Sequence, residues 1–159
     1  MDGEGYPSSN PPNPFMADFT LGPGQTWSGY DRYIWLSGEV EIPHDFVGKV
    51  TGLFDFGETG GGGNSGFESL FYLNGTLYQG VDSNHIEVLL GDICPGDKVL
   101  LQFRLWSGLI GGGEPRDNFY VIRQMELEVL DEATDRFYFL MKNLLDAHKT
   151  LEEHSPYKT

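Results

Sequence analysis

Three polar residues stand close together where a strand-like segment gives way to a loop: Asp82, Asn84 and His85. Their carboxylate, amide and imidazole groups can form forked hydrogen bonds with neighbouring hydroxyls of a sugar. Glu68, which begins the preceding strand-like segment, adds a second carboxylate. These residues form a candidate carbohydrate-binding site. In the simpler alternative, Asp82 and His85 only satisfy the backbone groups of a tight turn.

Aromatic residues strengthen the carbohydrate interpretation, because flat apolar rings with polar edges suit the C–H faces of pyranose sugars. The candidates are Trp27, Tyr30, Tyr33, Trp35, Tyr72, Tyr78 and Trp106. Aromatic residues that alternate along strands usually belong to the core, however. We therefore expect Trp35 and Trp106 to be core residues.

Carboxylates near a glycine-rich segment raise a second chemistry, the hydrolysis of glycosidic bonds. A retaining glycosidase needs two carboxyl groups about 5 Å apart. The candidates are Asp55, Glu58, Glu68, Asp82 and Glu87. In so acidic a chain, some carboxylates lie close together by chance, so we assign no catalytic residue here.

Metal and phosphate sites are not predicted either. The four histidines, His44, His85, His148 and His154, lack the i, i+4 spacing of a zinc-binding helix. A calcium ion held by loop carbonyls and Asp82 or Asp55 stays an open alternative. The glycine-rich run 57–66 precedes a strand-like segment, whereas a phosphate loop needs a following helix.

A hairpin is expected to position the polar residues. Asn74-Gly75 lies between two apolar-rich runs and predicts a type I′ turn, whose central residues both need positive φ. Further alternating segments at 32–42, 49–56, 98–106 and 119–130 predict strands joined by glycine-rich or proline-containing turns. The sequence therefore predicts a mainly β fold, an antiparallel β-sandwich of jelly-roll or galactose-binding-like type, with a C-terminal α-helix.

The chain divides into an irregular, proline-rich lead over 1–25, a sandwich domain over 26–130 and a helix over 131–155. Apolar residues at helical spacing from Ala133 to Leu151 predict the helix, with Asp131 as its N-cap and Ser155-Pro156 as its stop. Either the chain's own sheet covers the apolar stripe of this helix, or another domain does.

The composition of the chain limits which binding partners and which cellular compartment are expected. The 24 acidic and 10 basic residues give a formal net charge of −14, which disfavours nucleic acid and anionic membranes as partners. No apolar run is long enough to span a bilayer, and no signal peptide is predicted. The single cysteine, Cys94, excludes an internal disulfide, and we expect it to be a buried apolar residue. These features predict a cytoplasmic protein.

Four segments, in order along the chain, resemble the N-terminal β-sandwich domain of glycoside hydrolase family 38 α-mannosidases. They are 29–35, VEIPHDFVGKV at 40–50, FDFGETGGGGNSGFESLFYLNG at 54–75 and YQGVDSNHIEVLL at 78–90. The predicted helix after Asp131 resembles the connector that leads into the catalytic domain of that family.

The resemblance implies a parent enzyme that hydrolyses α-mannosides with retention, using a carboxylate nucleophile and a zinc ion that binds the sugar. In the family these groups belong to the catalytic domain, and no position here matches their motifs. The chain would then be a non-catalytic N-terminal domain, inactive alone, whose partners are a downstream zinc-containing catalytic domain and mannosides. Assembly into a homo-oligomer is also compatible with the sequence. The alternatives are a stand-alone carbohydrate-binding module and a small jelly-roll glycanase.

Overall fold

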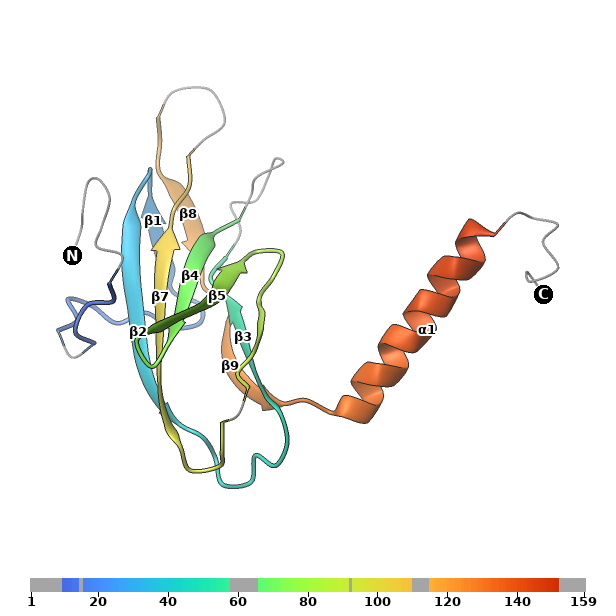
Figure 1. The fold of residues 1–159 in the computed structure, drawn as a ribbon. Helices are drawn as coiled ribbons and strands as arrows, with labels where there is room; N and C mark the ends of the chain where they lie inside the picture. The colour runs from blue at the N-terminus through green and yellow to red at the C-terminus, as the bar shows by residue number, and fades with distance from the viewer. Residues whose placement is uncertain (1–9, 15, 58–65, 92, 110–114, 152–159) are drawn as a thin grey trace.

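The computed structural model describes residues 10–14, 16–57, 66–91, 93–109 and 115–151. They form the strands β1 (Thr26–Gly29), β2 (Tyr33–Glu41), β3 (Val50–Asp55), β4 (Glu68–Leu73), β5 (Thr76–Asp82), β6 (Glu87–Leu89), β7 (Lys98–Trp106), β8 (Asn118–Val121) and β9 (Gln124–Val129), followed by the helix α1 (Glu132–Thr150). All pairings between these strands are antiparallel. The predicted β-sandwich with a C-terminal helix is confirmed (Figure 1).

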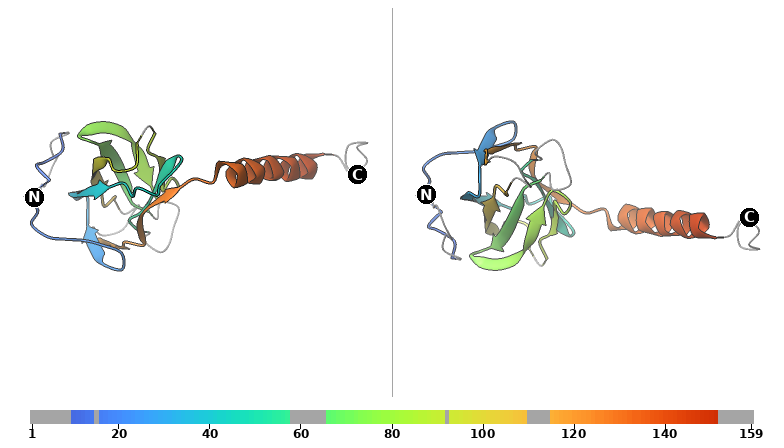
Figure 2. Two further views of the ribbon diagram at one scale, coloured as in Figure 1. Left: turned by 90° about the horizontal axis from the view of Figure 1, so that it is seen from below. Right: turned by 90° about the horizontal axis from the view of Figure 1, so that it is seen from above.

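The strands form two layers. One is the four-stranded sheet β2-β7-β4-β5, and the other contains the sheet β6-β3-β9 and the pair β1-β8 (Figure 2). If β8 and β9 are counted as one strand, the second layer has the order β1-β8/β9-β3-β6. Apart from the β4–β5 hairpin, successive strands then alternate between the layers, which is the connectivity of a jelly roll.

The prediction of one continuous strand over 119–130 is wrong. The path breaks at Ile122 and Arg123, because the N–H of Ile122 donates to the carbonyl of Gln25 (2.9 Å) and the N–H of Arg123 to that of Asp55 (2.8 Å). At this point the chain stops pairing with β1 and begins pairing with β3. The short strand β1 was not predicted.

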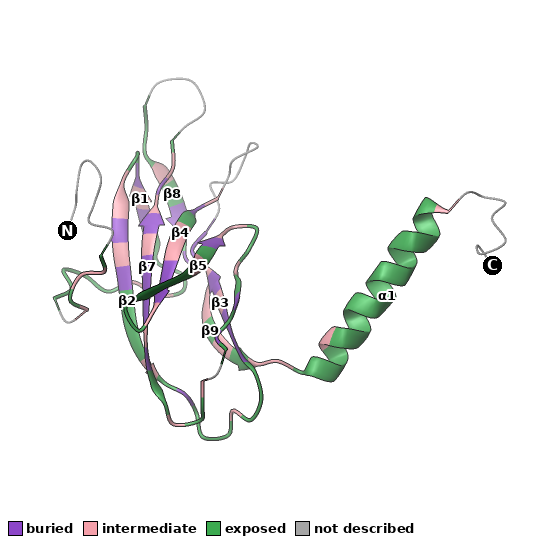
Figure 3. Cartoon of the chain, viewed as in Figure 1, coloured by how far each residue is buried: buried purple, intermediate pink, exposed green. Residues whose placement is uncertain are grey.

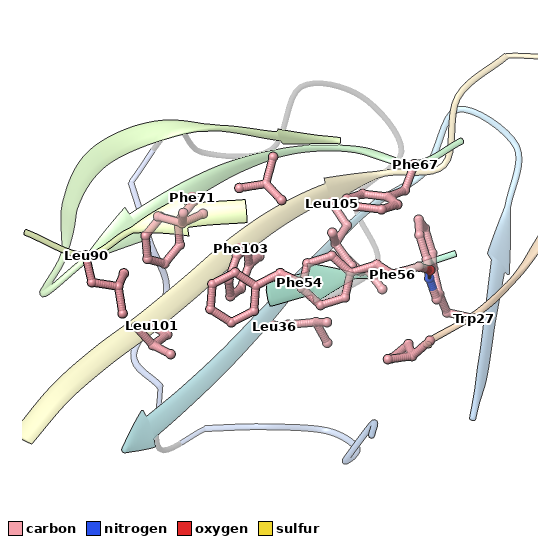
Figure 4. Close-up of a cluster of buried hydrophobic side chains, with 14 of the residues drawn as sticks. Trp27, Leu36, Phe54, Phe56, Phe67, Phe71, Leu90, Leu101, Phe103 and Leu105 are labelled. Carbon is pink, nitrogen blue, oxygen red and sulfur yellow. Dashed lines mark hydrogen bonds between the residues drawn. The ribbon is translucent and has the colours of Figure 1, made fainter. Parts of the chain in front are cut away.

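The core between the two layers combines aliphatic side chains with a central cluster of phenylalanine rings (Figure 4). The ring of Phe103 on β7 lies 4.7 Å from that of Phe54, 4.8 Å from Phe71 and 4.9 Å from Phe56, measured between centroids. Burying each such side chain contributes about 1.5–3 kcal/mol to folding. These contacts join β3, β4 and β7 and thereby fix one layer against the other.

The predicted type I′ turn between β4 and β5 is confirmed. Asn74 and Gly75 have φ values of 52° and 78°. The side chain of Asn74 also accepts a hydrogen bond from the N–H of Leu100 (2.8 Å), and the N–H of Asn74 donates to the carbonyl of Leu100 (2.8 Å). These bonds tie the turn to the first residues of β7.

Side chains close the sandwich between β5 and β6. The hydroxyl of Tyr78 donates to the carbonyl of Leu89 (2.8 Å), and the side-chain amide of Gln79 donates to the carbonyl of Glu87 (3.3 Å). Strands of the two layers are therefore joined along this side.

Helix α1 begins as predicted, because the carboxylate of Asp131 accepts hydrogen bonds from the N–H groups of Ala133 and Thr134. It ends at Thr150, earlier than predicted, and Leu151 is already extended. The expected remainder, 152–155, and the Ser155-Pro156 stop lie outside the described residues.

The helix projects away from the sandwich, and none of its residues is buried (Figure 3). The interpretation that the chain's own sheet covers the apolar stripe is therefore wrong. The helix touches the sandwich side at its base, where the ammonium group of Lys49 lies 2.7 Å from the carboxylate of Glu132.

Two smaller findings concern Cys94 and the membrane. Cys94 is exposed, not buried as expected, because it lies in the loop before β7, where its N–H donates to the carboxylate of Asp97 (2.9 Å). In the described part of the chain, no helix is long and apolar enough to cross a membrane.

Candidate functional site

Asp82, Asn84 and His85 form a compact turn at the end of β5. One carboxylate oxygen of Asp82 accepts hydrogen bonds from the N–H groups of Asn84 (2.7 Å) and His85 (2.9 Å). Backbone bonds also join Asp82 and His85 in both directions. Much of the hydrogen-bonding capacity of this carboxylate is therefore used by the backbone of the turn. This agrees with the simpler alternative, in which Asp82 and His85 satisfy the backbone groups of a tight turn.

The carboxyl group of Asp82 nevertheless stays charged and accessible. Partial desolvation is the largest single influence and raises its pKa, but hydrogen bonds from the N–H of Asn84 and from the ring and N–H of His85 together outweigh it. The pKa of Asp82 is consequently lowered from its ordinary value of 3.8. The side chains of Asp82 and His85 are 37% and 76% exposed, so both are within reach of a ligand.

Glu68 lies next to Asp82 on the outer face of the four-stranded sheet. It is directly opposite Asp82 on β5 and opposite Trp106 on β7, and Trp106 is in turn opposite Tyr33 on β2. Residues that are directly opposite in an antiparallel pair have their side chains on the same face. We call these four residues, Tyr33, Trp106, Glu68 and Asp82, the outer row.

The residues next to the outer row along each strand point the other way. Ile34, Leu105 and Val81 are all buried and belong to the core. Because side chains alternate along a strand, the outer row faces away from the core. The structure thus brings Glu68 and Asp82 together, as the sequence suggested, and adds two aromatic residues to them.

A second row lies beside the first and contains Trp35, Arg104 and Leu70, which are opposite one another on β2, β7 and β4. The guanidinium group of Arg104 lies over the ring of Tyr33, 5.4 Å from its centroid. The Nε atom of Arg104 is buried, and in the described part of the chain it has no hydrogen-bond partner. Arg104 was not among the residues predicted for the site.

The prediction that Trp35 and Trp106 are core residues is wrong. Both are half-buried on the outer face, whereas Trp27 is buried and stacks on Tyr120 with 4.3 Å between ring centroids. The alternation of side chains along β7 predicts the outward position of Trp106. Since Phe103 and Leu105 point inward, Arg104 and Trp106 must point outward.

The remaining aromatic candidates do not join the outer row. Tyr72 is buried, and Tyr78 packs its ring edge against Phe71 in the core, 5.7 Å between centroids. Tyr30 is exposed and lies between β1 and β2.

The other predicted carboxylates are dispersed. Asp55 accepts a hydrogen bond from the N–H of Gly57 (2.9 Å) and lies 3.6 Å from the guanidinium group of Arg123. Glu87 is exposed on β6, and Glu58 lies outside the described residues. Among the residues that the structure describes, no three histidine, cysteine, aspartate or glutamate side chains are grouped as a metal ion would need.

The fold and this face define the chain as a jelly-roll β-sandwich protein with a mixed aromatic and charged outer sheet. Comparison with protein-family models, curated proteins and solved structures found no match. The resemblance to family 38 α-mannosidases therefore stays a prediction.

Proposed function

We propose that this chain is the non-catalytic N-terminal domain of a family 38 α-mannosidase, and that it supports the catalytic domain through α1. In this proposal the catalytic domain holds the zinc ion and the nucleophile, and the sandwich borders the substrate cleft. A cytoplasmic location belongs to the same proposal, because a chain with a single cysteine has no internal disulfide that would require an oxidising compartment.

The observation that carries the proposal is the uncovered apolar face of α1. It consists of Phe137, Leu140, Met141, Leu144 and Leu145, which recur at intervals of three and four residues and are 40% to 63% exposed. Contiguous apolar patches of this kind mark interaction surfaces. In proteins, most of the stability of a helix comes from tertiary packing of its apolar face and not from helix propensity.

The distribution of charge favours a linked domain over a second copy as the occupant. The 19 residues of α1 contain three acidic residues, Glu132, Asp135 and Asp146, and three basic ones, Arg136, Lys142 and Lys149. The helix is therefore neutral, and the whole formal charge of −14 falls on the rest of the chain. Pairing two copies through α1 would bring two strongly negative bodies together, whereas an apolar surface on a covalently linked domain carries no such penalty.

An open hollow at the base of α1 extends the same surface. Lys49 and Leu130 line it on the sandwich side, and Ala133, Phe137 and Leu140 line it on the helix side. A side chain from the catalytic domain that entered this hollow would contact both the sandwich and the helix, which would fix the angle between them.

The first experiment is to determine the reading frame that continues beyond Thr159 and to assay the full-length product on a p-nitrophenyl α-mannoside. We expect a long downstream domain and α-mannosidase activity, with none in residues 1–159 alone. A reading frame without such a domain contradicts the proposal. Mannoside hydrolysis by the isolated chain, abolished by one carboxylate substitution, would instead identify the glycanase.

The second experiment tests the docking face in the full-length enzyme. Leu144→Asp should destabilise the enzyme by about 3 kcal/mol or more, because it loses apolar burial and places a charge in the interface. Asn143→Asp adds the same charge on the polar side of the helix and should behave as wild type. Equal thermal midpoints for the two variants would show that this face is not buried in the enzyme.

A further inference from the structure

We propose that the outer face of the sheet β2-β7-β4-β5 binds a neutral glycan built of pyranose sugars, which lies along the outer row and contacts Arg104. This site goes beyond the proposed supporting role, and nothing in it depends on α1. It extends the predicted Asp82–His85 turn from a local loop to a surface that crosses four strands.

The aromatic part of the face provides the stacking surface. The rings of Tyr33 and Trp106 are side by side, with centroids 6.2 Å apart and planes 22° from parallel. Trp35 follows Tyr33 on the same face of β2, and its ring lies 5.3 Å from that of Tyr72. Neighbouring strands are about 4.8 Å apart, so a row across four strands spans about 14 Å, which suits a short oligosaccharide better than a single sugar.

The polar part of the face provides donors and acceptors at fixed places. The guanidinium group of Arg104 lies over the ring of Tyr33, and in the described part of the chain its Nε atom has no hydrogen-bond partner. A guanidinium group carries five N–H donors. It can therefore donate to sugar hydroxyls. Glu68 and Asp82, at the other end of the outer row, can accept from them.

The balance of charge selects a neutral ligand. Glu68 and Asp82 place two carboxylates against one guanidinium on this face, and the chain as a whole has a formal charge of −14. A polyanionic glycan or a nucleic acid would be repelled. A neutral glycan can accept hydrogen bonds from the guanidinium group and donate hydrogen bonds to the carboxylates without charge repulsion.

The face is also held in place before any ligand arrives. The indole N–H of Trp106 donates to the carboxylate of Asp31 (2.8 Å), and the turn bonds hold the carboxylate of Asp82. The N-terminal lead crosses this sheet farther along, where the side chain of Gln102 donates to the carbonyl of Pro12 (3.1 Å). Fixed side chains lose less conformational entropy on binding, which favours affinity.

Isothermal titration calorimetry of residues 1–159 with α-linked mannan oligosaccharides tests the proposal. We expect binding that Trp106→Ala and Arg104→Gln each weaken about tenfold or more. Phe119→Ala, which removes an exposed aromatic ring from β8 in the other layer, should leave the affinity unchanged. Trp106 is half-buried, so its replacement can also destabilise the fold. Glu68→Gln changes an exposed side chain and is therefore the second test, in which we again expect weaker binding. Thermal melts confirm that each variant is folded.

Three outcomes would overturn the inference: no binding, binding only to a polyanion such as polygalacturonate, or affinity that the Glu68, Arg104 and Trp106 variants leave unchanged. Leu144→Asp in α1 should not alter glycan affinity. Failure of the glycan site and failure of the α1 docking face are thus separate results.

Discussion

At the scale of single residues, the Asp82 carboxylate has two roles. One oxygen closes the turn that follows β5, and the side chain also ends the outer row beside Glu68. The turn therefore fixes where the carboxylate stands on the sheet face. A change that moves the turn should alter the site even when no residue of the outer row is replaced.

Gly66 offers such a change. A Cβ atom at this position would lie 1.8 Å from the Oγ atom and 2.2 Å from the Cβ atom of Ser83, which is inside the turn. Gly66→Ala should therefore destabilise the protein by about 1–3 kcal/mol and displace Asp82. Denaturant unfolding measures the first effect and the NMR chemical shifts of residues 82–85 the second.

Gly38→Ala is the matched control for this prediction. Gly38 lies on β2, and a Cβ atom there would meet nothing within 4 Å. Its effect should stay within about 0.5 kcal/mol. Equal effects of the two substitutions would show that the approach of Gly66 to Ser83 does not matter for stability.

At the scale of elements, α1 depends on its first turn. Because no residue of α1 is buried, its helicity in the isolated chain comes from local interactions, of which the Asp131 cap is the most specific. The hydroxyl of Thr134 also donates to the carboxylate of Asp131 (2.8 Å). Chiefly because of the hydrogen bonds from Thr134, the pKa of Asp131 is lowered from its ordinary value of 3.8.

The helix should therefore respond to pH. Since the pKa of Asp131 is lower in the folded state, its contribution is fully present above the ordinary value of 3.8 and is lost as the pH falls through the folded value. Far-ultraviolet circular dichroism should show helicity falling in that acidic range. Asp131→Ala should lower the helicity at pH 7 and weaken this pH dependence.

Asp146→Ala is the control, because it removes the same charge near the other end of α1. An acidic residue there opposes the helix dipole, although Asp146 also pairs with Lys149 at 3.1 Å. We expect little or no loss of helicity. If Asp146→Ala lowered helicity as much as Asp131→Ala, capping would not be the reason for the effect.

At the scale of the whole molecule, the sandwich and the helix are energetically separate. The core joins the two layers, whereas among the residues that the structure describes α1 meets the sandwich side through the exposed Lys49–Glu132 ion pair. Exposed ion pairs contribute at most about 1 kcal/mol. Removal of residues 132–159 should therefore leave the thermal midpoint of the sandwich almost unchanged.

Phe103→Ala provides the contrast. It removes the ring that contacts Phe54, Phe56 and Phe71, and should cost about 3–5 kcal/mol. Differential scanning calorimetry of both variants measures the two effects. A large drop in the midpoint after truncation would mean that the helix stabilises the sandwich by a route absent from these contacts.

Local patterns predicted much of this fold. Asn74-Gly75 identified the hairpin because its turn needs two positive φ values, and the alternation of Leu101, Phe103 and Leu105 identified the inner face of β7. The break at Ile122 and Arg123 could not be predicted, because the bonds that cause it come from Gln25 and Asp55, far away in the sequence.

The site was predicted only in part. The pairing of Glu68 with Asp82 depends on the register shift between Phe71 and Tyr72, because the regular register of a two-residue hairpin would pair Glu68 with Val81. The neighbours on β2 and β7 depend on strand order, which the sequence does not contain. Aromatic character alone predicts a core position for Trp35 and Trp106, whereas the alternation of β2 and β7 places both on the outer face. The apolar stripe of α1 predicts that the helix has a packing partner, but the spacing of its residues does not identify that partner.

The hydrogen bonds of Tyr78 and Gln79 to the β6 backbone also protect the protein from self-association. As the last strand of its sheet, β6 would otherwise present open carbonyl groups at Glu87 and Leu89, to which a strand from another molecule can add in aggregation or domain swapping. Side chains that reach across to the facing layer obstruct that approach. This margin of the roll is therefore a poor template for fibril growth, which matters for a domain expressed at high concentration.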